Sequence, residues 1–234
     1  MASLVRYELD DSIATLTLDD GRKNLVSPAM LRDIHLALDR AAADRAVVLL
    51  TGAGTTFSAG FDLGVMGSGR EQALAMVRGG FELAERMLAH PFPVVVACNG
   101  HAIAMGAFLL LSADYRIGAD GPFRIVANEV AIGLTMPRPA VELMRHRLTP
   151  ACFQRATLLA EAFVPREAVA AGFLDRVVAA DDLRREARDF ALGLRTLSMD
   201  AHAASKARAR QAVLEAVRAG IAADFEAPAA AAAA

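Results

Sequence analysis

The chain is poor in several residue types that often mark a function. Its 234 residues include no tryptophan, two cysteines and two lysines, Lys23 and Lys206. Cys98 and Cys152 lie in apolar stretches and have no Cys or His partner at metal-ligand spacing, so we expect neither a zinc site nor a disulfide framework. The formal net charge of −2 supplies no basic surface, which argues against a nucleic acid or an anionic membrane as partner.

Long apolar runs and familiar catalytic signatures are also missing. The longest apolar run, Ala102–Leu111, is shorter than the roughly 20 residues of a membrane span. Met1–Val5 has no basic segment followed by an apolar one, so no secretion signal is expected. No phosphate loop of the GxxxxGKS or GxxxxGKT type occurs, and Ser58 and Ser112 have no evident His/Asp partner for a serine hydrolase. Together with the two free thiols, these absences predict a cytoplasmic protein without a membrane span or a metal.

Aliphatic sequence in alternating strand and helix patterns makes up most of the chain. Hydrophobic residues account for 55% of it. Residues 46–52 and 93–100 are apolar runs of strand length, typical of strands buried on both faces, and 13–18 alternates as a half-buried strand does. Helices are predicted after Ser27-Pro28, which suits an N-cap and a first helical residue, and over Arg70–His90. This alternation predicts an α/β fold.

The remaining segments complete one predicted domain. Residues 52–69 hold many small residues and are predicted to form a loop. Further elements are predicted as strands over 115–119 and 173–178, the latter at a sheet edge, and as helices over 139–147, 151–160, 166–171, 181–194 and 203–224. The core is expected to span 1–180, with a helical C-terminal region over 181–228. A run of six alanines, 229–234, is given no function.

Two segments have backbone groups that suit a ligand. TTFSAGFDLG, residues 55–64, follows a buried strand, where α/β proteins often bind ligands. AMGAFLLLSAD, residues 104–114, predicts a helix that begins near Met105, where free N–H groups suit a developing oxyanion. From spacing alone, the first segment is more simply a tight turn, and the second is equally well a core helix.

A third segment, VANEVAIGL at 126–134, places Glu129 in an apolar stretch bounded by Gly133 and Pro137. Burial raises the pKa of a carboxylate toward neutrality, which suits a general base. The alternative is a glutamate that faces solvent on a loop. No Asp or Glu occurs between Glu129 and Glu142, so a second base is not evident.

Four segments in a fixed order resemble the crotonase family, also called the enoyl-CoA hydratase/isomerase family. They are FSAGFDL (57–63), PVVVACNGHAIAMGAFLLLSADYRI (93–117), NEVAIGL (128–134) and REAVAAGFLDRVV (166–178). The resemblance extends from about residue 4 to about residue 215 and implies a ClpP-like spiral of ββα repeats. It also implies a helical C-terminal region used for trimerisation, often as a dimer of trimers. The implied substrate is an acyl-CoA thioester, with coenzyme A as part of the substrate and no separate cofactor.

The resemblance implies roles for individual residues as well. The N–H groups of Phe61 and Met105 bind the thioester oxygen, and Glu129 is the acid–base residue. The family often has a Gly-Gly-Gly run where this chain has Met105-Gly106-Ala107, so Met105 must adopt a conformation open to non-glycine residues. Hydratases of the family carry a second glutamate three residues after this donor, at the position of Phe108. The other residues expected at the substrate are Lys23 with its neighbours Arg22 and Asn24, Ala59, Gly60, Asp62, Gly106 and Gly133.

A single carboxylate favours one reaction over the other. Hydration of a 2-enoyl-CoA requires an activated water and a proton delivered at C2, and Phe108 can supply neither. Moving a double bond from C3 to C2 requires one base, and NEVAIGL resembles the matching segment of single-glutamate enoyl-CoA isomerases. We therefore expect an isomerase, with an enoyl-CoA hydratase of fatty-acid β-oxidation and a non-catalytic acyl-CoA carrier as the alternatives.

Three charged residues are given roles outside the chemistry. Asp62 is expected to hold its loop in place, and Asp114 to cap or orient the strand that follows it. Lys206 is interpreted as a solvated surface charge, with contact to the phosphates of a neighbouring subunit's ligand as the alternative.

Overall fold

Six strands form the main sheet of the computed structural model, which describes residues 3–225. In spatial order they are β1 (Val5–Asp10), β2 (Ile13–Leu18), β3 (Val47–Gly52), β5 (Val94–Cys98), β7 (Tyr115–Ala119) and β9 (Arg176–Val178). β1 and β2 pair antiparallel, and every other neighbouring pair is parallel. The strands predicted from apolar runs are confirmed, and β9 lies at the predicted edge.

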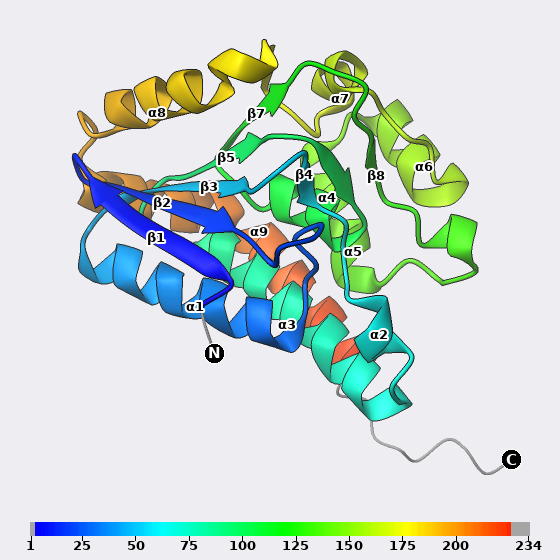
Figure 1. Ribbon diagram of the computed structural model, residues 1–234. Helices are drawn as coiled ribbons and strands as arrows, with labels where there is room; N and C mark the ends of the chain where they lie inside the picture. Colours follow the sequence, from blue (N-terminus) through cyan, green and yellow to red (C-terminus); the bar gives the residue numbers. More distant parts are fainter. Residues whose placement is uncertain (1–2, 226–234) are drawn as a thin grey trace, which may run out of the picture.

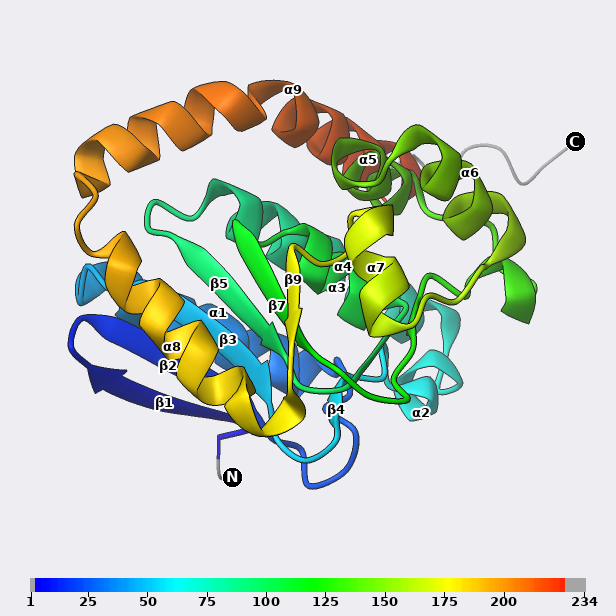
Figure 2. The same ribbon diagram turned by 90° about the horizontal axis from the view of Figure 1, so that it is seen from above.

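Helices cover both faces of this sheet (Figures 1 and 2). α1 (Pro28–Ala43) and α3 (Arg70–Ala89) pack on one face, and α8 (Leu183–Leu194) lies across the other. Along β3, Val48 and Leu50 belong to the first cluster of buried side chains, whereas Val47 and Leu49 pack with α8. The unbroken apolar run of β3 therefore reflects a strand that is covered on both sides. α1 begins after the predicted Ser27 N-cap.

A second sheet is built from three very short parallel strands. They are β4 (Thr56–Ser58), β6 (His101–Ile103) and β8 (Ile125–Val126), with β6 in the middle. The prediction that 52–69 is a loop was wrong in part, because this segment contains β4 and the one-turn helix α2 (Leu63–Met66). Three or four residues carry no readable periodicity, and β4 is held by pairing with β6, more than forty residues further along.

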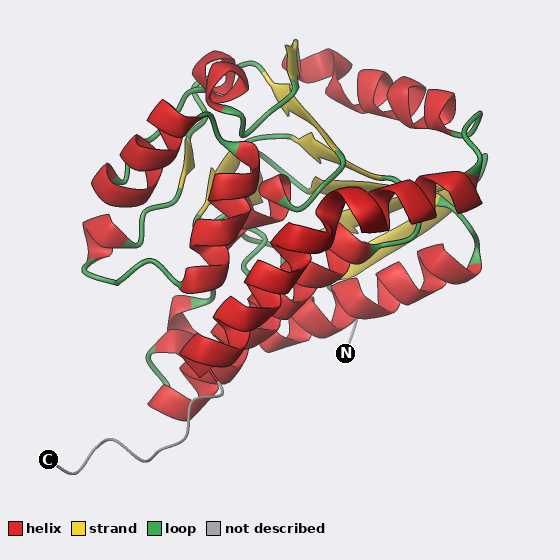
Figure 3. Ribbon diagram, turned by 180° about the vertical axis from the view of Figure 1, so that it is seen from behind, coloured by secondary structure: helices red, strands yellow, loops and turns green. Residues whose placement is uncertain are grey.

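The C-terminal half contains the remaining helices, and its last part, from residue 181 onward, is helical as predicted. Its elements are α4 (Met105–Leu111), the 3₁₀ turn η1 (Val130–Ile132), α5 (Arg138–Arg147), α6 (Pro150–Leu159), α7 (Pro165–Ala171), the 3₁₀ turn η2 (Ala180–Asp182) and α9 (Met199–Phe225). α9 lies along α3 and α5 at the back of the molecule (Figure 3), and its Val217 and Ile221 join the main core. The alanine run 229–234 and residues 226–228 lie outside the described residues. None of the helices within 3–225 is both long and apolar enough to span a membrane.

Lys206 corrects one expectation. Its side chain is buried, not solvated, and its Nζ lies 2.7 Å from Oδ2 of Asp114. Asp114 also accepts from the backbone N of Val94 at 2.6 Å, so it joins the start of β7 to the start of β5. The long lysine side chain reaches this carboxylate because α9 packs along α3 and α5. The spacing of residues in the sequence does not show this placement.

Candidate active site

The three segments singled out from the sequence follow the three strands of the small sheet. β4 is followed by Gly60 and Phe61, β6 by Ala104 and Met105, and β8 by the segment that contains Glu129. The strands are parallel, and the carboxyl ends of parallel strands meet at one edge of a sheet. The small sheet therefore brings together residues that are up to 68 positions apart in the chain, from Phe61 to Glu129.

Two glycines allow the first two segments to touch. A Cβ on Gly60, whose φ is +85°, would lie 2.9 Å from the carbonyl oxygen of Ile103. A Cβ on Gly106 would lie 2.5 Å from the carbonyl oxygen of Ser58. Any side chain at either position would push the two backbones apart, so glycine is required at both for the close approach.

The backbone amides of Phe61 and Met105 are without a protein acceptor among residues 3–225. By contrast, the N–H of Asp62, after Phe61, donates to Val26 O at 3.4 Å, and the N–H of Ala104, before Met105, donates to Val126 O at 2.8 Å. Met105 is the first residue of α4, and the first N–H groups of a helix have no partner within it. Two free donors on adjacent segments can stabilise an oxyanion.

Ala104 has the backbone strain that Met105 avoids. Its φ and ψ are +49° and −117°, a region that residues with a Cβ rarely adopt, whereas Met105 is helical. The conformation is held from both sides: Ala104 N donates to Val126 O at 2.8 Å, and Ala104 O accepts from Ala107 N and Phe108 N. The strained turn aims the start of α4 at the end of β8.

Glu129 is buried, with only 6% of its surface exposed. Burial raises the pKa of its carboxyl from 4.5 to about 7. Its Oε2 and the neighbouring Asn128 Oδ1 are both buried without a hydrogen-bond partner within the described chain. The expectation of a desolvated carboxylate is confirmed, and such a group can take up and return a proton near neutral pH.

Comparison with known proteins places this site in a family. A family model described as enoyl-CoA hydratase/isomerase matches residues 8–230. The chain belongs to the enoyl-CoA hydratase/isomerase family. A crystal structure of a family protein from Pseudomonas syringae is 49% identical and has a TM-score of 0.94, covering 95% of this chain and 97% of that one. The predicted fold class and family are thereby confirmed.

Three further solved structures, of two proteins, bear on the reaction within the enoyl-CoA hydratase/isomerase family. A Mycobacterium tuberculosis protein is called an enoyl-CoA isomerase in one structure (46% identical, TM-score 0.91, covering 96% of this chain and 100% of that one) and probable enoyl-CoA hydratase EchA3 in another (47%, 0.91, 95% and 96%). Human mitochondrial delta3-delta2-enoyl-CoA isomerase is 26% identical with a TM-score of 0.90, covering 95% and 89%. Both names of the family thus occur among the similar proteins.

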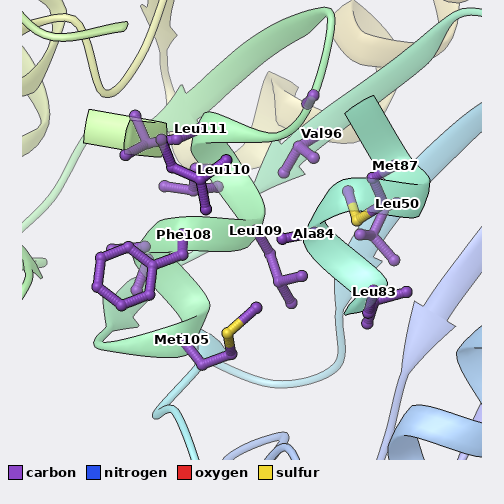
Figure 4. Packing of buried hydrophobic residues seen from close by; sticks show 14 of the residues in the cluster. Leu50, Leu83, Ala84, Met87, Val96, Met105, Phe108, Leu109, Leu110 and Leu111 are labelled. Atoms are coloured by element: carbon purple, nitrogen blue, oxygen red, sulfur yellow. The ribbon is translucent and has the colours of Figure 1, made fainter. Parts of the chain in front are cut away.

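Phe108 lies one turn after Met105 in α4, at the position where the family resemblance places a second glutamate of the hydratases. It is 1% exposed, and its ring centroid is 5.7 Å from that of Phe81 in α3. In Figure 4 Met105 and Phe108 project from the first turns of α4, while Leu109 points toward α3. The apolar ring is therefore part of the packing beside the first turn of α4, which begins with the free N–H of Met105.

Asp62 and Glu142, the carboxylates that lie near the site residues in the sequence, have other hydrogen-bond or ion-pair partners. Asp62 caps α2 by accepting from Gly64 N at 2.8 Å, which matches the predicted role of holding its loop. Glu142 forms an ion pair with Arg145 at 3.4 Å on α5. Within residues 3–225, no group of three or more His, Cys, Asp or Glu side chains is arranged to hold a metal ion.

The other residues expected at the substrate are placed less uniformly. Lys23 is exposed, and its carbonyl accepts from Ala59 N at 3.0 Å, so the loop at 22–24 lies beside the loop at 59–62. Gly133 is exposed in a left-handed turn (φ +80°) just after η1, with open space where a Cβ would lie. The structure thus brings Lys23 and Ala59 together and leaves Gly133 on the surface beyond Glu129.

Sequence reasoning missed the residues that support the first donor. Asn24 is buried, and its side-chain amide donates to Thr56 O at 2.7 Å and Ala53 O at 3.1 Å. Ser58 Oγ donates to Asn24 O at 2.7 Å and accepts from Gly60 N at 3.2 Å. Asn24 was expected at the substrate only as a neighbour of Lys23, although asparagine side chains often satisfy the backbone groups of turns and loops.

Proposed function

We propose that this family member is an enoyl-CoA isomerase that moves a double bond from C3 to C2 of an acyl-CoA thioester. The observation that carries the proposal is Phe108: a fully buried aromatic ring stands where a hydratase of the family has its second glutamate. Glu129 then acts as the one acid–base residue, in surroundings that raise its pKa to about 7. Coenzyme A is part of the substrate, and we expect no further cofactor.

The reaction uses the geometry as follows. The thioester oxygen accepts hydrogen bonds from the N–H groups of Phe61 and Met105, which stabilise the dienolate that forms when the C2 proton leaves. Glu129 takes that proton and returns it at C4. A single positioned oxyanion donor contributes on the order of 10² to 10³ in rate. A single positioned base contributes on the order of 10² to 10⁴. The apolar ring of Phe108 helps to keep water, which would compete for the proton, out of the site.

The test compares both substrates with three proteins. Parent protein, Glu129→Gln and Glu142→Gln are incubated with a 3-enoyl-CoA and with a 2-enoyl-CoA. We expect the parent to isomerise the first and to hydrate the second slowly, Glu129→Gln to lose isomerisation, and Glu142→Gln to behave as the parent because its partner Arg145 lies on a surface helix.

Two outcomes would contradict the proposal. Efficient hydration by the parent would show that Phe108 does not exclude the hydratase reaction. Hydratase is the alternative function, because similar proteins from M. tuberculosis are named probable enoyl-CoA hydratases. Tight acyl-CoA binding without either reaction would favour a carrier. We also expect a homotrimer or a dimer of trimers located in the cytoplasm.

A further inference from the structure

Gly80 lies in the middle of α3, directly against the side chains of both proposed oxyanion donors. A Cβ added there would lie 2.6 Å from Cε1 and from Cζ of the Phe61 ring and 3.1 Å from Sδ of Met105. Real Cβ contacts are not found at 2.6 Å, so the ring and the thioether fill the space that a side chain at this position needs. Phe61 and Met105, which are distant in sequence, therefore both occupy the space that a side chain at position 80 would need.

The adjacent glycine has no such relation to the site. Gly79 is half-buried, and the atom nearest to an added Cβ there is Cδ1 of Leu31, at 3.2 Å. Both glycines stand in the interior of the same helix, where glycine is a poor helix former compared with alanine. The helix thus carries an unfavourable residue twice, and only at Gly80 does the lack of a side chain make room for the donors.

The backbone on either side of Phe61, and before Met105, is held in place by hydrogen bonds. Phe61 lies between Gly60, whose carbonyl accepts from Val26 N at 2.8 Å, and Asp62, which caps α2. Met105 is fully buried and follows the strained Ala104. A side chain at position 80 must therefore displace the Phe61 ring, the Met105 thioether or α3 itself. Phe61 and Met105 each adjoin a glycine at which the two backbones touch closely, Gly60 and Gly106, so such a displacement would act beside the two free N–H groups.

The next residue of α3 contacts the third part of the site. Phe81 packs on Phe108 at 5.7 Å, and on Phe225 of α9 at 6.3 Å. Positions 80 and 81 of α3 thus touch both donors and the ring that stands in place of a second glutamate. This fixes the rotation of α3 about its axis, so that the bare backbone of Gly80 faces the donors.

We propose that Gly80 is a positioning residue for the oxyanion hole. Its missing side chain lets Phe61 and Met105 lie close enough together for both N–H groups to reach one thioester oxygen. This inference rests on the proposed function, because it assumes that the two amides bind that oxygen. Displacements of about 1 Å in such a site cost on the order of 10²-fold in rate.

The test uses the two neighbouring glycines as a matched pair. Gly80→Ala is expected to lower kcat for a 3-enoyl-CoA by about 10- to 100-fold with little change in KM, since the two N–H groups stabilise mainly the dienolate that forms during the reaction. Gly79→Ala is expected to retain the kcat of the parent. A purely structural role of Gly80 would lower the amount of folded enzyme and leave kcat per folded molecule intact. Gly80→Ala with kcat within twofold of the parent would overturn the inference.

A double variant tests the contact itself. Leucine lacks the Cε1 and Cζ atoms that clash, so the loss caused by Gly80→Ala should be several-fold smaller in a Phe61→Leu background than in the parent. An equal loss in both backgrounds would overturn the inference. If Gly80→Ala alone fails to fold, the comparison of Phe61→Leu with Phe61→Leu/Gly80→Ala decides instead, and a further loss of 10-fold in the double variant would count against the contact.

The isomerase proposal can fail separately. If the parent hydrates a 2-enoyl-CoA and does not isomerise, the same glycine pair is compared on hydration, where a thioester oxygen must also be stabilised. The positioning role then stands or falls on that ratio while the isomerase assignment is lost. If the parent catalyses neither reaction, both proposals are overturned.

Discussion

The two ends of α4 differ in whether the buried polar groups around them have hydrogen-bond or ion-pair partners. At its first residue, Met105, the backbone N–H has no acceptor in the part of the chain that the structure describes, and there the nearby Glu129 keeps Oε2 buried and unpaired. At its last residue, Leu111, and just beyond it, at Ala113, the carbonyls accept from Arg147, and Ala113 O accepts also from Arg210 at 3.2 Å. One end of the same seven-residue helix is left open, and the other is closed by cations.

Asp114 is the centre of the closed end. Its carboxylate lies 2.7 Å from Lys206 Nζ and 2.9 Å from Nη2 of Arg210, and it accepts from Val94 N. Burial lowers the pKa of Lys206 to about 8, even though Asp114 favours its charged form. The unpaired atoms at this end are on neutral rings, since burial lowers the pKa of His90 to about 4.

The difference teaches how to separate a structural buried charge from a functional one. A buried polar group without a partner costs free energy that folding alone does not return. Asp114 has its charge compensated by side chains that α9 supplies. Glu129 and the two free amides keep their hydrogen-bonding capacity, which a substrate can use.

The largest effect is expected when the open end loses its carboxylate. Glu129→Gln should lower the isomerisation rate by about 10² to 10⁴ because the base is gone. The free energy of unfolding at pH 8 should not fall, because a neutral amide replaces a buried charge. Steady-state kinetics and urea denaturation on the same sample measure both. A variant that is inactive and also unstable would place Glu129 with the structural charges.

Loss of the carboxylate at the closed end should have the reverse pattern. Asp114→Asn leaves Lys206 and Arg210 buried without a counter-charge and should lower the free energy of unfolding by about 3–5 kcal/mol. Activity per folded molecule should be retained. Asp189→Asn, which removes an exposed ion pair with Arg185, is the control and should change stability by about 0.5 kcal/mol or less. Equal effects of the two variants would contradict the role given to Asp114.

The pH dependence of stability should also distinguish the open end. The pKa of Glu129 is raised from 4.5 to about 7 in the folded protein, so the folded state binds more protons than the unfolded state between these values. The contribution of Glu129 to the stability of the parent therefore falls as pH rises from about 4.5 to 7, by about 3 kcal/mol in total.

Glu129→Gln lacks this loss, so the difference in unfolding free energy between the two proteins should grow with pH over the same interval. The difference is the quantity to measure, because His90, whose pKa is lowered to about 4, makes both proteins less stable toward acid and cancels between them. A difference that does not change with pH would mean that Glu129 ionises as an exposed glutamate does.

The smallest effect concerns the turn that opens α4. Ala104→Gly should raise the free energy of unfolding by about 1 kcal/mol, because glycine adopts φ +49° and ψ −117° without strain, which outweighs its greater freedom in the unfolded chain. Ala107→Gly, one turn into the same helix, should lower it by about 1 kcal/mol. Thermal or urea unfolding of both variants measures the contrast, and changes of the same sign would show that Ala104 is unstrained.

Periodicity predicted most of the main sheet and its helices because these elements are long enough to show their pattern. β3 and β5 stood out as apolar runs, and α1 had a legible N-cap. The small sheet was not predicted, because strands of two or three residues form only by pairing with strands that are distant in the sequence. Lys206 was misjudged for a related reason: whether a lysine is solvated depends on what its helix crosses.

The amino-acid order alone establishes a lone carboxylate at Glu129, an apolar residue at 108 and glycine-containing turns after the strands, because residue identity and local pattern require no neighbours. The meeting of Phe61, Met105 and Glu129 at one sheet edge is a property of the folded molecule. So are the burial that raises the pKa of Glu129 and the contact of both donors with Gly80. Each depends on packing between segments separated by many residues, and distance along the chain does not encode distance in space.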